Sequence, residues 1–203
     1  NIASLSAEAV TGFTTAQMAA LTTAQIAALT TANVALLETA DLAALGSAQL
    51  RALSDGQLAA LQDTQLAALG SAQVAALSAT QLAGLDPTKL VALGTAQFAA
   101  MTTAQIAALT ADQAAALETA DIHAWNTAQM AALSTRSLAA FDGSQLAALT
   151  TTQAAALSAA QAAAIDAGDL STMGTANLAA LSTAAVQALS TAQLGGIEAD
   201  QLA

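Results

Sequence analysis

Cysteine and tyrosine are absent from the 203-residue chain, and proline, histidine and tryptophan occur once each. Without cysteine the chain has no thiol nucleophile, no disulfide and no thiolate ligand for zinc or an iron–sulfur cluster. Only Arg51, Lys89 and Arg136 are basic, against fourteen acidic residues, and the net charge is −11. Because nucleic acids and anionic lipid surfaces are bound by basic patches, neither is expected as a partner.

Long apolar runs are also missing, although 56% of the residues are hydrophobic. Thr, Ser, Gln or Asp interrupts the apolar residues every few positions, so no segment approaches the roughly 18 residues that a membrane span needs. The single histidine, His123, has no serine and carboxylate partners that would form a catalytic triad. We therefore expect neither a membrane span, nor an enzyme, nor a bound cofactor.

The chain is built instead from an eight-residue repeat with the consensus L-[ST]-T-A-Q-[LIV]-A-A, as in residues 21–28, which define positions 1 to 8 of the octad. A large apolar residue occupies position 1 at every octad from Leu5 to Ile197, without an insertion or deletion. Position 6 is apolar throughout, from Ile2 to Leu202. The pattern predicts one continuous array over 1–203, with about 25 repeats, cut from a longer array.

Positions 2 and 5 predict where a helix begins within each octad. Position 2 is Ser, Thr, Asp or Asn in 17 of 25 octads, the residues preferred at a helix N-cap, and position 5 is Gln in 16 of 26. Thr-x-x-Gln is a capping box, in which the two side chains bond each other's backbone amides. Pro87 directly follows Asp86, as expected for proline at the first helical residue. Each octad is therefore predicted to form a helix of about one and a half turns.

Such short helices are stable only when they stack on one another. A single long helix is excluded, because eight residues advance about 80° beyond two full turns and the apolar stripe would wander around it. The sequence predicts an all-α solenoid with one helix per octad. Position 2 repeats its residue type at intervals of 24, as in Gly46, Gly70 and Gly94, which favours three octads per turn. A triangular β-solenoid is the alternative, although Ala, Leu and Gln favour helix.

The acidic residues are the candidates for a metal site. All fourteen lie at positions 2 to 5, and three octads carry an acid at both position 2 and position 5. Oxygen clusters of this kind can bind Ca²⁺. Acids at a helix N-terminus also complement the free amides and the helix dipole, which explains their confinement without a metal. We therefore assign no metal, and the Ca²⁺ candidates are Glu38, Asp41, Glu118, Asp121, Asp166 and Asp169.

Threonine at position 3 is not explained by capping, yet it is frequent. Evenly spaced hydroxyls and methyls on a rigid solenoid could order water, which makes an ice-binding face an alternative function. The position-3 threonines that motivate it are Thr15, Thr23, Thr31, Thr39, Thr95 and Thr103.

The octads L-[ST]-x-x-Q-[LIV]-x-A resemble the octapeptide tracts of very large secreted or surface-exposed bacterial proteins of the adhesin-like, type-I-secreted kind. The resemblance implies an extracellular or cell-surface protein that forms a fibre, filament or stalk. The first and last octads remain apolar at positions 1 and 6, where solenoids usually have polar caps. Either the array continues in a longer protein or copies stack on one another, and we expect self-association, end to end or lateral, as the chief interaction. The alternative is a binding module that contacts a surface or cell, either ice-binding or Ca²⁺-dependent and adhesive.

Overall fold

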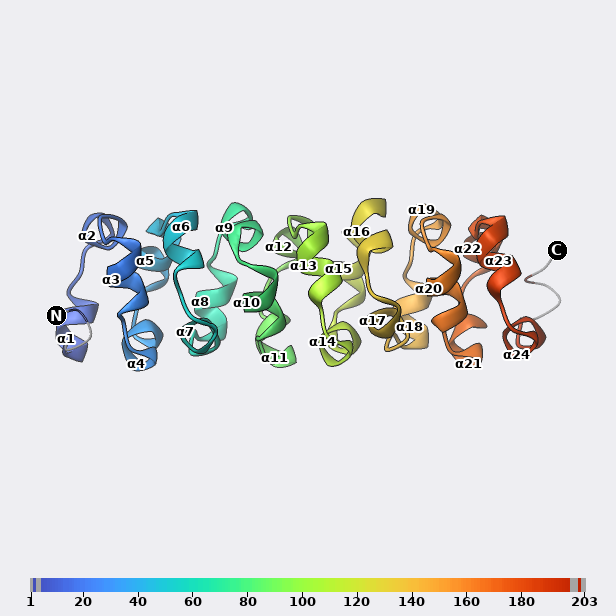
Figure 1. The fold of residues 1–203 in the computed structure, drawn as a ribbon, viewed down its shortest axis with the longest axis horizontal. Coiled ribbons are helices and arrows are strands. Elements are labelled where there is room, and N and C mark those ends of the chain that lie inside the picture. Colours follow the sequence, from blue (N-terminus) through green and yellow to red (C-terminus); the bar gives the residue numbers. More distant parts are fainter. Residues whose placement is uncertain (1, 3–4, 198–200, 202–203) are drawn as a thin grey trace. The chain divides into compact units, whose positions relative to one another are not determined.

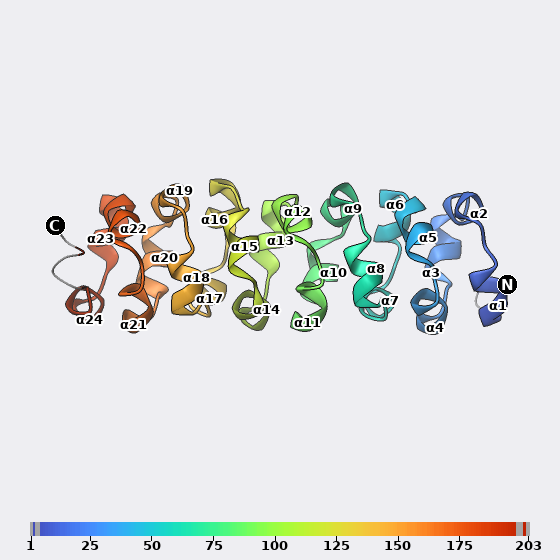
Figure 2. The ribbon, with the colours of Figure 1, turned by 180° about the vertical axis from the view of Figure 1, so that it is seen from behind.

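A computed structural model describes residue 2, residues 5–197 and residue 201. This part of the chain forms 24 short α-helices of four to six residues and no strand (Figures 1 and 2). Among these helices none has the length and apolar character that crossing a membrane would require. The helices are α1 (Ala7–Thr11), α2 (Thr15–Ala19), α3 (Thr23–Ala27), α4 (Thr31–Ala35), α5 (Thr39–Ala44), α6 (Ser47–Arg51), α7 (Asp55–Ala59), α8 (Asp63–Ala67), α9 (Ser71–Ala76), α10 (Ala79–Ala83), α11 (Pro87–Leu90), α12 (Thr95–Ala99), α13 (Thr103–Ala108), α14 (Ala111–Ala116), α15 (Thr119–His123), α16 (Thr127–Ala132), α17 (Thr135–Leu138), α18 (Gly143–Ala147), α19 (Thr151–Ala155), α20 (Ala159–Ala164), α21 (Ala167–Leu170), α22 (Thr175–Ala180), α23 (Thr183–Ala188) and α24 (Thr191–Gly195).

Each helix begins where the sequence predicts, directly after position 2. At α3 the Thr22 hydroxyl accepts a hydrogen bond from the Gln25 backbone N–H at 3.2 Å, and Gln25 Oε1 accepts one from the Thr22 N–H at 2.7 Å. This is a complete capping box, and it satisfies amides that have no partner inside so short a helix. Asp86 is the N-cap of α11 and Pro87 its first residue, as predicted.

The helices end at positions 6 to 8, and the apolar residue of position 1 follows in the turn. The Ile26 N–H donates to the Thr22 carbonyl at 3.0 Å, and the Leu29 N–H donates to the Ile26 carbonyl at 3.1 Å. The chain then turns to extended backbone, as at Leu45 with φ −68° and ψ 135°. No described residue has a positive φ. Because the turn needs no left-handed residue, a bulky apolar side chain can occupy it in every octad.

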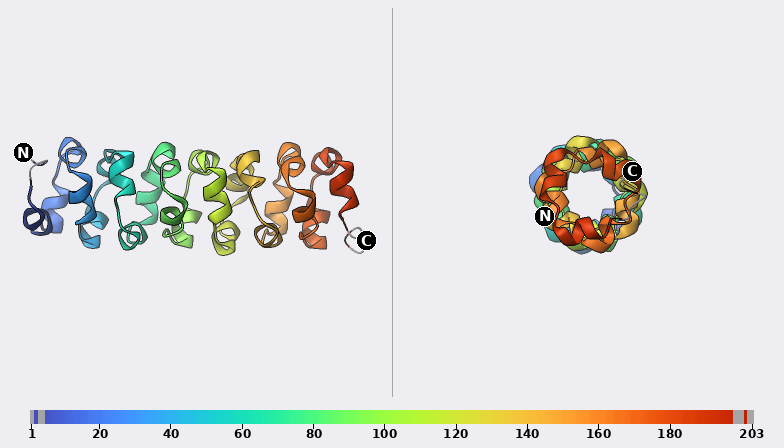
Figure 3. Two further views of the ribbon diagram at one scale, coloured as in Figure 1. Left: turned by 90° about the horizontal axis from the view of Figure 1, so that it is seen from below. Right: turned by 90° about the vertical axis from the view of Figure 1, so that its right-hand side faces the viewer.

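Three octads make one turn of the solenoid. Within residues 1–101 and within residues 102–203, which form two compact units, helices pack against the third helix along the chain: α2 packs on α5, α5 on α8, and α14 on α17. One coil therefore takes 24 residues, as predicted, and the alternative of a β-solenoid is wrong. In either unit taken alone, the helices form the wall of the coil (Figure 3).

The core of each unit consists of positions 1 and 6. Leu42, Leu50 and Leu58 at position 6 are fully buried, and Phe98 is the largest side chain with no exposure. A buried side chain of this size contributes about 1.5–3 kcal/mol to folding, repeated at every octad. Position 7 faces solvent in most octads, and Leu202, the last residue of the position-6 series, lies outside the described residues.

Candidate functional site

The glutamine at position 5 joins each coil to the coil before it. Gln57 Oε1 accepts a hydrogen bond from the N-cap N–H of Ser54 at 2.7 Å, while Gln57 Nε2 donates to the carbonyls of Leu29 at 2.6 Å and Ile26 at 3.2 Å. One amide therefore completes a capping box with its oxygen and contacts the preceding coil with its nitrogen. The sequence predicts the first role and not the second.

This bond recurs with the same register in both units. The acceptor carbonyls lie 28 residues earlier, and in most cases also 31 residues earlier. We call this series of bonds the glutamine ladder. Its members include Gln49, Gln57, Gln65, Gln73, Gln81 and Gln97 in the first unit and Gln145, Gln153, Gln161, Gln193 and Gln201 in the second.

Most ladder side chains are buried between coils; Gln57, for example, is 3% exposed. A hydrogen bond contributes about 0.5–1.5 kcal/mol when it replaces bonds to water, but a buried polar group left without a partner costs about 1–3 kcal/mol. The ladder is stabilising because both ends of the amide are bonded. It also fixes the register, since a shift by one residue would separate every donor from its acceptor.

Other residue types at position 5 keep the same donor role. Asn177 Nδ2 donates to the Leu149 carbonyl at 2.7 Å, and Ser137 Oγ donates to the Leu109 carbonyl at 2.7 Å. Each acceptor lies 28 residues earlier, as for glutamine. Most position-5 residues therefore supply a hydrogen-bond donor that reaches the preceding coil, and glutamine is the most frequent of them.

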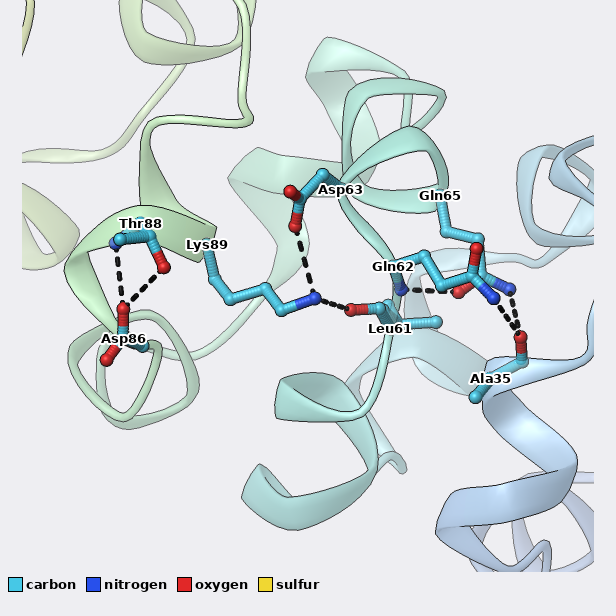
Figure 4. Close-up of polar contacts among 8 residues, drawn as sticks. All are labelled: Ala35, Leu61, Gln62, Asp63, Gln65, Asp86, Thr88 and Lys89. Carbon is cyan, nitrogen blue, oxygen red and sulfur yellow. Dashed lines mark hydrogen bonds and ion pairs between the residues drawn. The ribbon is translucent and has the colours of Figure 1, made fainter.

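Lys89 is the charged variant of this contact (Figure 4). Its Nζ donates to the Leu61 carbonyl at 2.6 Å and pairs with Asp63 Oδ1 at 3.1 Å. In the next coil back, Gln62 and Gln65 both donate to the Ala35 carbonyl, at 3.1 and 3.4 Å (Figure 4). The carbonyl groups along this face of the first unit are thus bonded by side chains of the following coil.

The six acidic Ca²⁺ candidates do not come together as a cluster. In the described part of the chain, no group of three or more His, Cys, Asp or Glu side chains could hold a metal ion. The position-2 acids Glu38, Glu118 and Asp166 face solvent. The position-5 acids turn toward the coil interface: Asp41 and Asp121 are buried and Asp169 is half-buried.

Asp41 differs from the ladder residues in having no donor. Burial raises the pKa of its carboxyl, the neighbouring Glu38 charge raises it further, and a hydrogen bond from the Glu38 backbone lowers it in part. The second carboxyl oxygen, Oδ2, is buried and has no hydrogen-bond partner. At a position that most octads fill with a hydrogen-bond donor, Asp41 therefore presents a buried oxygen without a partner.

The surface grooves between coils are a general feature of the fold. A groove of about 430 Å³ lies between residues 108–112 and residues 134–137, and one of about 420 Å³ lies between residues 35–39 and residues 62–65. The two grooves lie at the same octad positions, nine octads apart, and no octad position is charged in both of them. We therefore ascribe them to the backbone path of the coil.

The single histidine and the position-3 threonines lie on the surface. His123 is exposed, with Nδ1 3.4 Å from the Ala148 carbonyl. The six candidate threonines are exposed at the first residue of their helices. The structure therefore leaves the hydroxyls of position 3 facing solvent, where a binding face would need them.

A family model described as the ALTTAQ repeat matches the chain six times, at residues 1–31, 34–71, 85–119, 114–151, 122–159 and 162–199. The motif that gives this model its name stands unaltered at residues 20–25. No curated protein matches the chain. Together the matches cover most of the chain, although the ladder residues Gln73, Gln81, Gln161 and Gln201 lie outside them.

Proposed function

Because the chain belongs to the ALTTAQ repeat family, we propose that its helical solenoid serves as a structural element of an extracellular or cell-surface fibre, filament or stalk. In this proposal the chain has no catalytic role, and its chief partner is another copy of itself. The function rests on the regular stacking of coils, each of which presents a fixed surface to the next.

The glutamine ladder is the observation that carries this proposal. Every coil presents amide donors on one face and carbonyl acceptors on the other, so any coil can pair with any other in the same register. Gln17 and Gln25 complete their capping boxes but are exposed, unlike Gln57 in the interior. A coil that is not covered by its own chain therefore offers donors suited to the carbonyl face of a second chain.

The opposite face offers apolar surface beside its carbonyls. Val186 and Leu194 are 41% and 43% exposed, although their octad position is buried elsewhere. They border a pocket of about 170 Å³ whose remaining lining residues are Leu178, Ala179, Leu181, Leu189, Ile197 and Gln201. Covering this surface with a coil of another copy would bury apolar area and pair the carbonyls at once. Such a contact is heterologous, and a heterologous contact that does not close produces a filament.

Electron microscopy of the purified 203-residue chain, with light scattering over a range of concentrations, tests the proposal. The expected result is filaments that lengthen with concentration. The double variant Gln17→Glu/Gln25→Glu places carboxylates against the carbonyl face of a second copy and should abolish end-to-end assembly. The double variant Ala59→Glu/Ala67→Glu adds the same two charges at exposed position-7 sites in the interior of the first unit and should leave assembly intact. Monomers alone at high concentration, in the unaltered chain, would refute self-association.

A binding module is the second candidate function, and the exposure of the position-3 threonines favours its ice-binding form. Thermal hysteresis of the purified chain measures ice binding directly. Thr15 and Thr39 lie 24 residues apart and therefore on the same side of neighbouring coils, so their replacement by valine or lysine would test one such face. Calcium-dependent adhesion predicts instead a higher melting temperature with calcium than with chelator. Neither measurement depends on whether filaments form.

A further inference from the structure

Asp41 occupies the position from which glutamine elsewhere joins two coils. In a ladder octad one side-chain atom accepts from the N-cap N–H and the other donates to a carbonyl of the preceding coil. In Asp41, burial and the Glu38 charge raise the pKa of the carboxyl, and hydrogen bonding from the Glu38 backbone lowers it only in part. One oxygen, Oδ2, is buried without a partner in a residue that is 2% exposed.

The register of the ladder identifies the carbonyl group to which a protonated Asp41 would donate a hydrogen bond. Residues as short as asparagine and serine at position 5 bond the carbonyl 28 residues earlier, as Asn33 Nδ2 does with Leu5 at 3.3 Å. For Asp41 the corresponding carbonyl is that of Phe13, just before α2, and α2 packs on α5. If Asp41 were ionised, its carboxylate oxygen and the Phe13 carbonyl oxygen would both be acceptors, and no hydrogen bond could form between them. The chain would also bury an unpaired charge, which is costly.

We infer that Asp41 is a proton-binding site that couples pH to the contact between α2 and α5. When protonated, Asp41 Oδ2 donates to the Phe13 carbonyl and completes the ladder with a carboxylic acid in place of an amide. When ionised, Asp41 cannot donate this hydrogen bond, and its negative charge is buried at the contact between α2 and α5. The inference does not depend on the proposed structural function, because it concerns the folding of one chain.

The charges around Asp41 favour the protonated state. On its own octad the charged group is Glu38, whose negative charge opposes ionisation. The helix α2 carries no titratable residue, and α8 contributes Asp63, whose carboxylate is paired with Lys89 of α11. No positive charge on these packed helices faces Asp41 without a partner of its own. Asp121 takes the equivalent place in the second unit but has a partner, so the inference is confined to Asp41.

The sign of the pH dependence follows from the direction of the shift. The pKa of Asp41 is raised in the folded chain, so the stabilising contribution is complete below about pH 3.9, the ordinary value for aspartate, and is lost as pH rises through the raised value. Asp41→Asn supplies the missing donor at every pH. We expect it to raise the melting temperature of the chain at pH 8 and to have little effect at pH 4.

The experiment measures thermal unfolding of the unaltered chain, of Asp41→Asn and of the control Asp55→Asn from pH 4 to pH 8. Asp55 is an exposed acid of the same unit, so its replacement changes the net charge equally without touching the ladder. The difference between Asp41→Asn and the unaltered chain should grow with pH, while that for Asp55→Asn should not. Carbon-13 NMR of the Asp41 carboxyl in the unaltered chain follows its ionisation without any variant.

A carboxyl that loses its proton at or below pH 3.9 in the NMR titration would overturn the inference, whatever the stability of the variant. So would a stabilisation by Asp41→Asn that stays constant from pH 4 to pH 8, because that result would reflect packing or general charge. Protonation of Asp41 well above pH 3.9, together with a pH-dependent gain from the asparagine, supports it.

Discussion

Counted from the N-cap at position 2, octads 38–45 and 86–93 belong to the same unit and to the same side of the coil, yet they replace the ladder glutamine in opposite ways. In octad 86–93 the replacement is Lys89, a permanent donor that bonds the Leu61 carbonyl and pairs with Asp63. In octad 38–45 it is Asp41, whose Oδ2 has no partner. The difference shows that donors of different size and charge at position 5 can bond the preceding coil, whereas Oδ2 of Asp41, which is an acceptor, has no partner there.

Converting an interior ladder residue into an acid should have the largest effect. Gln65→Glu places a buried carboxyl against the carbonyls of Val34 and Leu37, where Gln65 Nε2 donates at 3.2 and 2.6 Å. Leaving a buried charge without its partner costs about 3–5 kcal/mol, so we expect a loss of this order at pH 7 that shrinks as the carboxyl is protonated toward pH 4. Chemical denaturation at the two pH values measures it.

Gln25→Glu is the matched control for this variant. Gln25 has the same octad position and the same capping box with Thr22, but it is exposed and no preceding coil contacts it in the structure. In the dissociated chain, at low concentration, its replacement should change the free energy of unfolding by only a few tenths of a kcal/mol. Equal losses at Gln65 and Gln25 would mean that the capping box, and not the contact between coils, is the source of the stability.

Lys89→Met should have the next largest effect. Methionine keeps the apolar stem of lysine and removes the donor, which leaves the Leu61 carbonyl without this bond at a cost of about 1–3 kcal/mol. The lost pairing with Asp63 adds less than about 1 kcal/mol, because the Asp63 side chain is largely exposed. Lys89→Gln restores the ladder form and should recover most of the loss in urea denaturation. Failure of glutamine to do so would show that the charge, and not the donor, matters in octad 86–93.

The start of each helix could be predicted from the sequence because the signals are local. Thr22 and Gln25 lie three residues apart, and a capping box requires nothing beyond that octad. The bond from Gln49 to Leu21 spans 28 residues and depends on the number of octads per turn, for which the sequence offers only the recurrence of similar residues. One signal was available: Gln49 is retained although its N-cap is Gly46, which has no side chain to complete a box.

The burial of Asp41 could not be predicted for the same reason. Within its octad, Asp41 is one of several acids near a helix N-terminus, where a solvated carboxylate is favourable. Only the stacking of α5 on α2 turns position 5 toward another coil and separates the buried Asp41 from the exposed Glu38. The paired acids therefore suggest a Ca²⁺ site in the sequence, while in the structure they face different environments.

Ser137 extends the comparison to the second unit, with a smaller expected effect. Its hydroxyl is 1% exposed, donates to the Leu109 carbonyl and contacts Ser134 Oγ at 2.7 Å. Ser137→Ala removes this donor and should cost about 1–2 kcal/mol. Ser137→Gln should stabilise the unit by about 0.5–1.5 kcal/mol, because it can add the capping bond to Ser134 and a bond to the Ile106 carbonyl. If glutamine destabilises this octad instead, the ladder geometry around α17 differs from that of its neighbours.

Asp86→Asn should have the smallest effect, and its sign should be opposite to that of Asp41→Asn. The Thr88 hydroxyl and backbone N–H donate to Asp86 Oδ1 at 2.6 and 2.9 Å and lower the pKa of this exposed carboxyl. The ionised form therefore stabilises α11 above about pH 3.9, and the contribution is lost as pH falls through the lowered value. Because asparagine also caps helices well, Asp86→Asn should cause only a slight loss at pH 7, and this loss should disappear in acid. Measured with Asp41→Asn over the same pH range, the two variants should shift the free energy of unfolding in opposite directions at pH 8. If both shift it the same way, the response reflects the net charge of −11 and not the individual sites.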